Sequence, residues 1–260
     1  WIKAELSGVR ENLENTLRHF FNRLESTQPL AALYRKTQHI RSARAMDDYA
    51  LAAWTAQIMF RANENPPLEK YNPGRVTLEF MRALAKLSWS ENGPLLAKEF
   101  LEKNGISLII EPHLSHTYLD GAAVLIKSER PLIGMTLRHD RIDNFWFTLM
   151  HELAHLSLHL KEDSPEYFDD LEFETHTDPQ ENEADYLAGE ALIPQNEWKK
   201  SPAFNLRSPE AAEHLARKLQ IHPAIVAGRM RHEFKIYRHF NRLVGYHQVR
   251  KHFPNFHWKN

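Results

Sequence analysis

Residues 141–160 decide the fold, and they read RIDNFWFTLMHELAHLSLHL. Apolar side chains recur here at helical spacing, and the first half is apolar on almost every side, so we expect a buried core helix. His151 and His155 are four residues apart and therefore share one face of that helix. Burying two histidines and Glu152 costs on the order of several kcal/mol unless they are paired or bound to a metal. The stretch therefore predicts a core helix that carries a metal site.

The segment from His151 to His155 is an HExxH motif, in which both imidazoles can bind one ion. Glu152 lies about 100° further round the helix, off the metal but close enough to act as general base on a metal-bound water. A catalytic zinc site uses three protein ligands and keeps one position open. We therefore predict Zn2+ as the cofactor and expect a third ligand further along the chain.

The third ligand is expected in residues 181–194, which read ENEADYLAGEALIP. On a helix, Glu181 and Asp185 share a face with small alanines, which allow close approach to the first helix. Glu181 is the predicted third ligand, and Asp185 is the predicted acceptor for the N–H of a ligand histidine. Glu183, on the opposite face, is the alternative ligand. His159 is expected to be structural, because no glycine turn precedes it as in the three-histidine zinc class.

Three short apolar runs precede the HExxH helix, at residues 106–110, 122–126 and 132–136. They predict a small three-stranded sheet and hence an α+β fold, flanked by N- and C-terminal helices. Proline-rich breaks follow a helical run at 49–60. We expect an N-terminal helical segment over 1–65, a central domain over 66–205 that holds both motifs, and a basic C-terminal helical segment over 206–260.

The composition excludes several functional classes. The chain has no cysteine, which rules out disulfides, thiolate catalysis and cysteine-bound metal. Lys and Arg number 33 against 34 Asp and Glu, so no global charge predicts binding to nucleic acid or to a membrane surface. No apolar run approaches the ~20 residues that span a bilayer. We expect no membrane partner and a cytoplasmic location.

The two motifs together resemble the ImmA/IrrE metallopeptidases, in which a HExxH helix precedes a helix of the form E-x-E-A-N/D-x-F-A-x-x-L-L-M-P. Five residues match functional positions of that family: His151 and His155 its zinc ligands, Glu152 its catalytic glutamate, Glu181 its metal-binding glutamate and Asp185 its Asn/Asp position. Leu187 and Ile193 replace the usual phenylalanine and methionine, and both keep an apolar core. The resemblance covers residues 100–200 and implies a zincin-like (gluzincin) zinc endopeptidase.

The same resemblance implies a regulatory setting. In many members the peptidase follows a helix-turn-helix domain of the XRE type, and we expect such a DNA-contacting domain upstream of Trp1. Family members are implicated in cleaving repressors that control stress, phage or toxin–antitoxin genes. The implied substrate is therefore a transcriptional repressor or an antitoxin. The alternative is a non-proteolytic binding module that uses the same fold as a scaffold, although such a module has no need of Glu152.

Weaker signals lie outside the two motifs. Five side chains are candidates for stabilising an oxyanion: His113, His116, Tyr118, Asp120 and His176. Residues 210–232 resemble a helix-turn-helix, but we expect a packing helix pair with a solvated basic face. The strand nearest the HExxH helix is expected to take an extended substrate backbone by strand addition.

Overall fold

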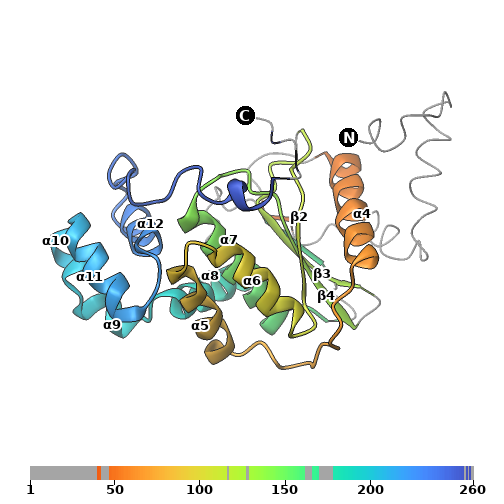
Figure 1. The fold of residues 1–260 in the computed structure, drawn as a ribbon, viewed down its shortest axis with the longest axis horizontal. Coiled ribbons are helices and arrows are strands. Elements are labelled where there is room, and N and C mark those ends of the chain that lie inside the picture. The colour runs from red at the N-terminus through yellow and green to blue at the C-terminus, as the bar shows by residue number, and fades with distance from the viewer. Residues whose placement is uncertain are drawn as a thin grey trace.

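The computed structural model describes residues 40–41, 47–115, 117–126, 129–161, 166–169, 178–254, 256 and 258. At its centre lies a five-stranded sheet of order β1-β5-β3-β4-β2 (Figure 1). The strands are β1 (Ile40–Arg41), β2 (Ser107–Ile110), β3 (Gly121–Ile126), β4 (Arg130–Met135) and β5 (Glu166–Asp169). β3 runs antiparallel to both β4 and β5, whereas β2 is parallel to β4 and β1 is parallel to β5.

The expectation of a three-stranded sheet is wrong, because the described residues form five strands. The three predicted strands are found as β2, β3 and β4. β5 comes from the acidic run 162–178, where Tyr167 and Phe168 favour a strand despite their charged surroundings. The strand-addition hypothesis also fails for β3, the strand that begins against Glu152, because β4 and β5 pair with both of its sides.

Helices cover both faces of this sheet (Figure 1). Among the described residues, α4 (Asp48–Glu64) lies on one face, and it contains the predicted helical run 49–60. Four helices lie on the other side: α5 (Leu78–Lys86), α6 (Gly93–Glu102), α7 (Ile142–Leu158) and α8 (Pro179–Leu192). Strands covered on both faces read as continuous apolar runs instead of alternating ones. β2 and β3 fit this rule, since their side chains are almost all buried.

α4 packs tightly against the sheet. A Cβ on Gly134 of β4 would lie 2.6 Å from the ring of Trp54 and 2.7 Å from Ile58, so only glycine leaves room for this contact. The Trp54 indole N–H also donates to the carbonyl of Glu111 at 3.0 Å. The predicted N-terminal segment, residues 1–65, thus contributes a helix that packs on the sheet. The domain boundary at residue 65 stays a prediction.

Further helices gather at the end of the molecule away from α4 (Figure 1). They are α9 (Gln195–Lys200), α10 (Pro202–Leu206), α11 (Pro209–Leu219) and α12 (Pro223–Glu233). Buried residues of α11 and α12 belong to the same core as α7, as expected of a packing pair. The described residues after Phe234 run in turns apart from a short 3-10 helix, Arg250–His252, so the segment 206–260 is helical mainly in its first half.

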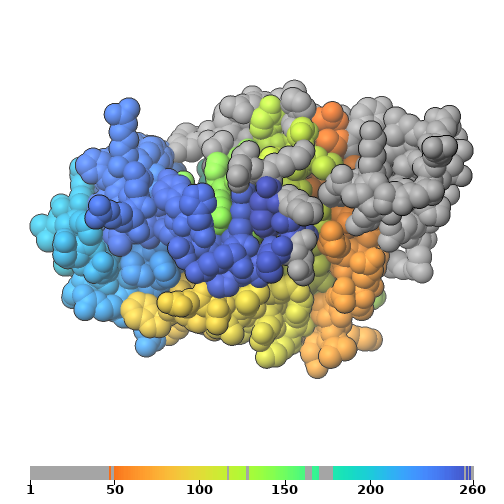
Figure 2. All heavy atoms as spheres, turned by 45° about the horizontal axis from the view of Figure 1, so that its top comes forward, coloured from red at the N-terminus to blue at the C-terminus, as the bar shows by residue number. Residues whose placement is uncertain are grey.

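The C-terminal residues, dark blue in Figure 2, lie against those of α5 and α6, in yellow. Asp140, just before α7, holds them in place, because its Oδ1 accepts the backbone N–H groups of Val249 and Arg250 at 3.0 Å each. Across the described ranges, no helix combines the length and apolar character needed to cross a membrane.

Candidate metal centre

The HExxH residues lie in the second half of α7, where His151, Glu152 and His155 are fully buried. α8 crosses this part of α7 through buried alanines, as its sequence predicts. Its start is fixed by Asp178, whose side chain accepts the backbone N–H of Gln180 at 2.9 Å. This cap places Glu181 in the first turn of α8, where a carboxylate interacts favourably with the helix dipole.

Four potential ligand atoms converge from α7, α8 and β5, all within 4.8 Å of one another. They belong to His151, His155, Glu181 and Asp169. The two Nε2 atoms are 2.9 Å apart, and they lie 3.3–3.5 Å from the oxygens of Glu181 and 3.5 Å from Oδ2 of Asp169. Zinc bonds of 2.0–2.1 Å in a tetrahedron give ligand separations of about 3.3 Å. The residues therefore fit a single divalent cation.

The charges in this cluster also call for a cation. Burial alone lowers the pKa of His151, but the nearby carboxylates, led by Asp169, raise it well above its usual value. Burial alone raises the pKa of Glu181, but contacts with His151 and His155 lower it far below its usual range. Neither oxygen of Asp169 hydrogen-bonds to a described residue. Buried carboxylates are costly without a compensating positive charge, which a divalent cation supplies.

Neighbouring side chains turn both imidazoles towards the cluster. Nδ1 of His151 faces Oδ1 of Asp185 at 2.9 Å, and Nδ1 of His155 faces Nδ1 of His159 at 3.0 Å. Nε2 of His159 in turn lies 3.0 Å from Glu183. We assign N–H donation from His155 to His159 and from His159 to Glu183, and we place the proton of His151 on Nδ1, on the side of the Asp185 carboxylate. This tautomer set leaves both ligand Nε2 lone pairs free for a metal.

The structure thus brings together the three predicted ligands, His151, His155 and Glu181. Asp185 stands beside His151, where the sequence placed it, and Glu183 contacts His159 instead of the cluster. Direct metal binding by the three residues stays a prediction.

Glu152, the predicted base, lies next to the cluster. Both of its oxygens are buried and make no hydrogen bond within the described part of the chain. Burial raises the pKa of its carboxyl well above the usual value, and the charge of Asp169 adds to this shift. A Cβ on Gly121, the first residue of β3, would lie 2.2 Å from Oε1 of Glu152. Glycine at this position therefore makes the room that the carboxylate occupies.

Asp169 is the member of the cluster that sequence reasoning missed. The alternation of side chains along a strand is the signal that could have found it. Tyr167 and Asp169 are two residues apart and therefore point to the same side of β5. The Tyr167 ring stacks on His155, with ring centroids 4.5 Å apart, so this side of the strand faces α7.

Some of the residues considered for oxyanion stabilisation lie within the described part of the chain. Asp120 is buried, and its carboxylate accepts a hydrogen bond from Arg138 at 3.0 Å, whereas an oxyanion needs a hydrogen-bond donor. Among the described His, Asp and Glu residues, His113 does not belong to the group of four, and the role of Tyr118 stays a prediction. His116 and His176 lie outside the described residues.

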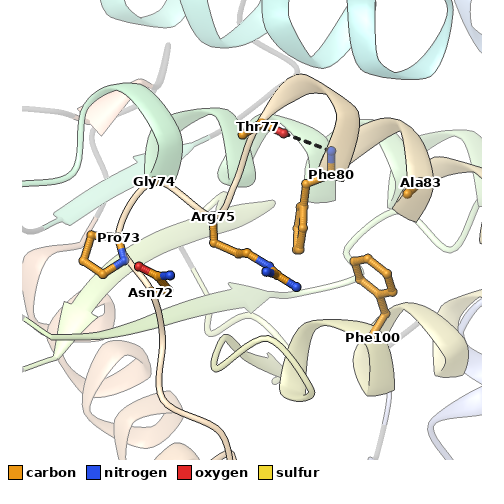
Figure 3. A pocket seen from close by; sticks show the side chains of 8 residues that line it. All are labelled: Asn72, Pro73, Gly74, Arg75, Thr77, Phe80, Ala83 and Phe100. Atoms are coloured by element: carbon orange, nitrogen blue, oxygen red, sulfur yellow. Dashed lines mark hydrogen bonds between the residues drawn. The ribbon is translucent and has the colours of Figure 1, made fainter.

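A surface hollow of about 480 Å³ lies apart from the cluster, between the loop 72–77 and helices α5 and α6 (Figure 3). Arg75 is the charged side chain among its lining residues, and the rings of Phe80 and Phe100 stand 5.0 Å apart at its wall. The hollow shares no residue with the metal cluster, and its lining offers no pair of acid and base groups. We therefore place the chemistry at the buried cluster.

Comparison with known proteins agrees with this choice. Residues 106–231 match the family model Peptidase_M78, described as the IrrE N-terminal-like domain. The matched range begins just before β2, ends within α12, and contains all four residues of the cluster. A search of curated proteins found no match to the chain.

Proposed function

Residues 106–231 belong to the Peptidase_M78 family, and on that premise we propose that the chain is a zinc-dependent endopeptidase with a zincin-like fold. The observation that carries the proposal is the convergence of His151, His155 and Glu181 on one point beside the buried carboxylate of Glu152. Two imidazoles and one carboxylate form the donor set of catalytic zinc sites that cleave peptides. Their convergence supports zinc over the harder ions that prefer ligands with oxygen alone.

The proposed chemistry is hydrolysis of a peptide bond. When bound, zinc polarises the scissile carbonyl and lowers the pKa of water to about 7. The Glu152 carboxylate takes a proton from the attacking water while the water oxygen forms a bond to the carbonyl carbon of the substrate. Glu152 then passes that proton to the amide nitrogen as the C–N bond breaks. His151 and His155 are held in position by Asp185 and His159 throughout.

Gly121→Ala is expected to lower turnover while leaving the metal in place. The new Cβ would lie 2.2 Å from Oε1 and 2.9 Å from Cδ of Glu152, so the carboxylate must move. A displacement of about 1 Å in a catalytic group costs roughly 10²-fold in rate. Kinetics with unfolded substrate and elemental analysis of the purified variant measure the two effects. Wild-type turnover in a folded Gly121→Ala protein would contradict the placement of Glu152.

The proposed substrate is a transcriptional repressor or an antitoxin, and we place the reaction in the cytoplasm. Its cleavage would regulate stress, phage or toxin–antitoxin genes. Contact with DNA through an upstream domain is part of the same proposal. Because the side chains of the cluster are buried, we infer that a substrate reaches them as a locally extended chain. A folded repressor therefore has to unfold locally before it is cleaved, and the isolated enzyme should be slow.

The proposal is tested on a candidate repressor in its native form and in a partially destabilised form. Each is incubated with zinc-loaded enzyme and with enzyme stripped by a chelator. We expect cleavage of the destabilised form by the loaded enzyme, slower cleavage of the native form, and none after stripping until zinc is restored.

Two results would count against it. Equal rates on native and destabilised substrate would reject local unfolding as the limiting step. A loaded enzyme that binds the destabilised repressor but leaves every peptide bond intact would favour the non-proteolytic binding module.

A further inference from the structure

The position of Asp169 is fixed by the backbone of β5. The Asp169 carbonyl accepts the N–H of Asp120 at 2.8 Å, and Asp169 pairs with Gly121 in the β3–β5 register. Because side chains alternate along a strand, Asp169 points to the same side as Tyr167, whose ring stacks on His155. The fold therefore delivers this carboxylate to α7 from the sheet, independently of the two helical motifs.

Within the described residues, the buried carboxylate of Asp169 has ion-pair contacts with the two histidines but no hydrogen bond. The side chain is fully buried, and neither oxygen hydrogen-bonds to a described residue. Oδ2 lies 3.5 Å from Nε2 of both His151 and His155, which is the separation of atoms that share an ion. The carboxylate of Glu152 is close enough to both Asp169 and Glu181 to repel them electrostatically. Glu181 in turn interacts with His151 and His155. A cation between these atoms relieves the repulsion and the cost of burial.

We propose that Asp169 is a fourth protein ligand of the same cation as His151, His155 and Glu181. The inference rests on the proposed function for the presence of that cation. Zinc sites with four protein ligands are closed, whereas catalytic sites keep one position for water or substrate. The resting centre is therefore closed, and Asp169 has to leave, or the coordination has to expand, before a water can bind. The protein rests in a latent state, with β5 supplying the group that blocks the open position.

The test compares wild-type protein with Asp169→Asn, which keeps the shape of the side chain and removes its charge. Asp169→Ala serves as a second variant, and Glu166→Gln on the same strand is the matched control, since its side chain points away from α7 by the strand alternation. Zinc affinity is measured by competition with a chelator. The open position is probed by adding azide to the cobalt(II)-substituted proteins and recording their visible spectra, while circular dichroism of the metal-free proteins checks folding.

We expect both Asp169 variants to bind zinc at least about 10- to 100-fold more weakly, because loss even of a group that supports a ligand costs that much. Azide should shift the cobalt spectrum of the Asp169 variants and leave the spectra of wild type and Glu166→Gln unchanged. Folded Asp169 variants with wild-type zinc affinity and no response to azide would overturn the inference.

The result also separates this inference from the proposed function. If His155→Ala loses zinc while both Asp169 variants keep wild-type affinity, the metal site stands and the fourth ligand is rejected. If the wild-type protein binds neither zinc nor cobalt, the proposed function fails first and the inference fails with it.

Discussion

His155→Ala is expected to lower zinc affinity by more than about 100-fold, because loss of a mere supporting group already costs 10- to 100-fold. The substitution removes the Nε2 atom that lies 2.9 Å from its counterpart on His151, and it also ends the contact with His159. Elemental analysis should give about one zinc per chain for wild type and almost none for the variant. Zinc should raise the melting temperature of the wild-type protein but not that of His155→Ala, because binding stabilises the folded state by mass action.

Glu183→Gln is the matched control for this experiment. Glu183 lies on α8, like Glu181, but its side chain is 64% exposed and reaches His159 instead of the cluster. Its variant should keep about one zinc, whereas Glu181→Gln should lose it. Full zinc in His155→Ala would contradict the metal site, and a reversed pattern for Glu181 and Glu183 would show that the third ligand is misassigned.

Glu152→Gln is expected to lower peptide-bond cleavage by about 10²- to 10⁴-fold, the usual contribution of a general base. The amide keeps the size of the carboxyl but cannot take the proton of the attacking water. Zinc content and melting temperature should stay close to wild type, because Glu152 is not among the four converging groups. Steady-state kinetics on an unfolded substrate, with zinc measured on the same samples, check both statements.

Undiminished cleavage by zinc-loaded Glu152→Gln would show that another group activates the water. Loss of zinc together with activity would instead place Glu152 among the ligands. Because Gly121→Ala displaces the same carboxylate sterically, the two variants should share one phenotype, reduced turnover with retained metal.

The helices and strands around the motifs could be predicted because their sequence patterns are strong. α8 begins at Pro179 and ends at Leu192, as its proline start and the proline at 194 indicate. The pairing of Glu181 with the histidines of α7 followed from helical spacing and from the small alanines between the helices. Such local rules suffice where ligands sit at fixed intervals on long periodic elements.

The contribution of β5 could not be predicted in the same way. Four residues in an acidic run give too short a pattern to outweigh the surrounding charges, and their strand conformation depends on pairing with β3. Asp169 therefore reaches the cluster through tertiary structure, with no spacing that links it to HExxH. Similarly, no sequence pattern showed that Trp54 of α4 would pack on Gly134 of a strand 80 residues further along the chain.

The central claim, that the buried cluster hydrolyses peptide bonds, is tested most directly by product analysis in ¹⁸O-labelled water. Zinc-loaded wild type and zinc-loaded Glu152→Gln are incubated with the same unfolded polypeptide, and the products are examined by mass spectrometry. We predict new fragments from the wild-type reaction, each newly formed carboxyl terminus carrying one ¹⁸O, and at least about 100-fold less of them from the variant. An intact polypeptide after incubation with zinc-loaded wild type, or equal yields of labelled fragments from both proteins, would contradict the claim.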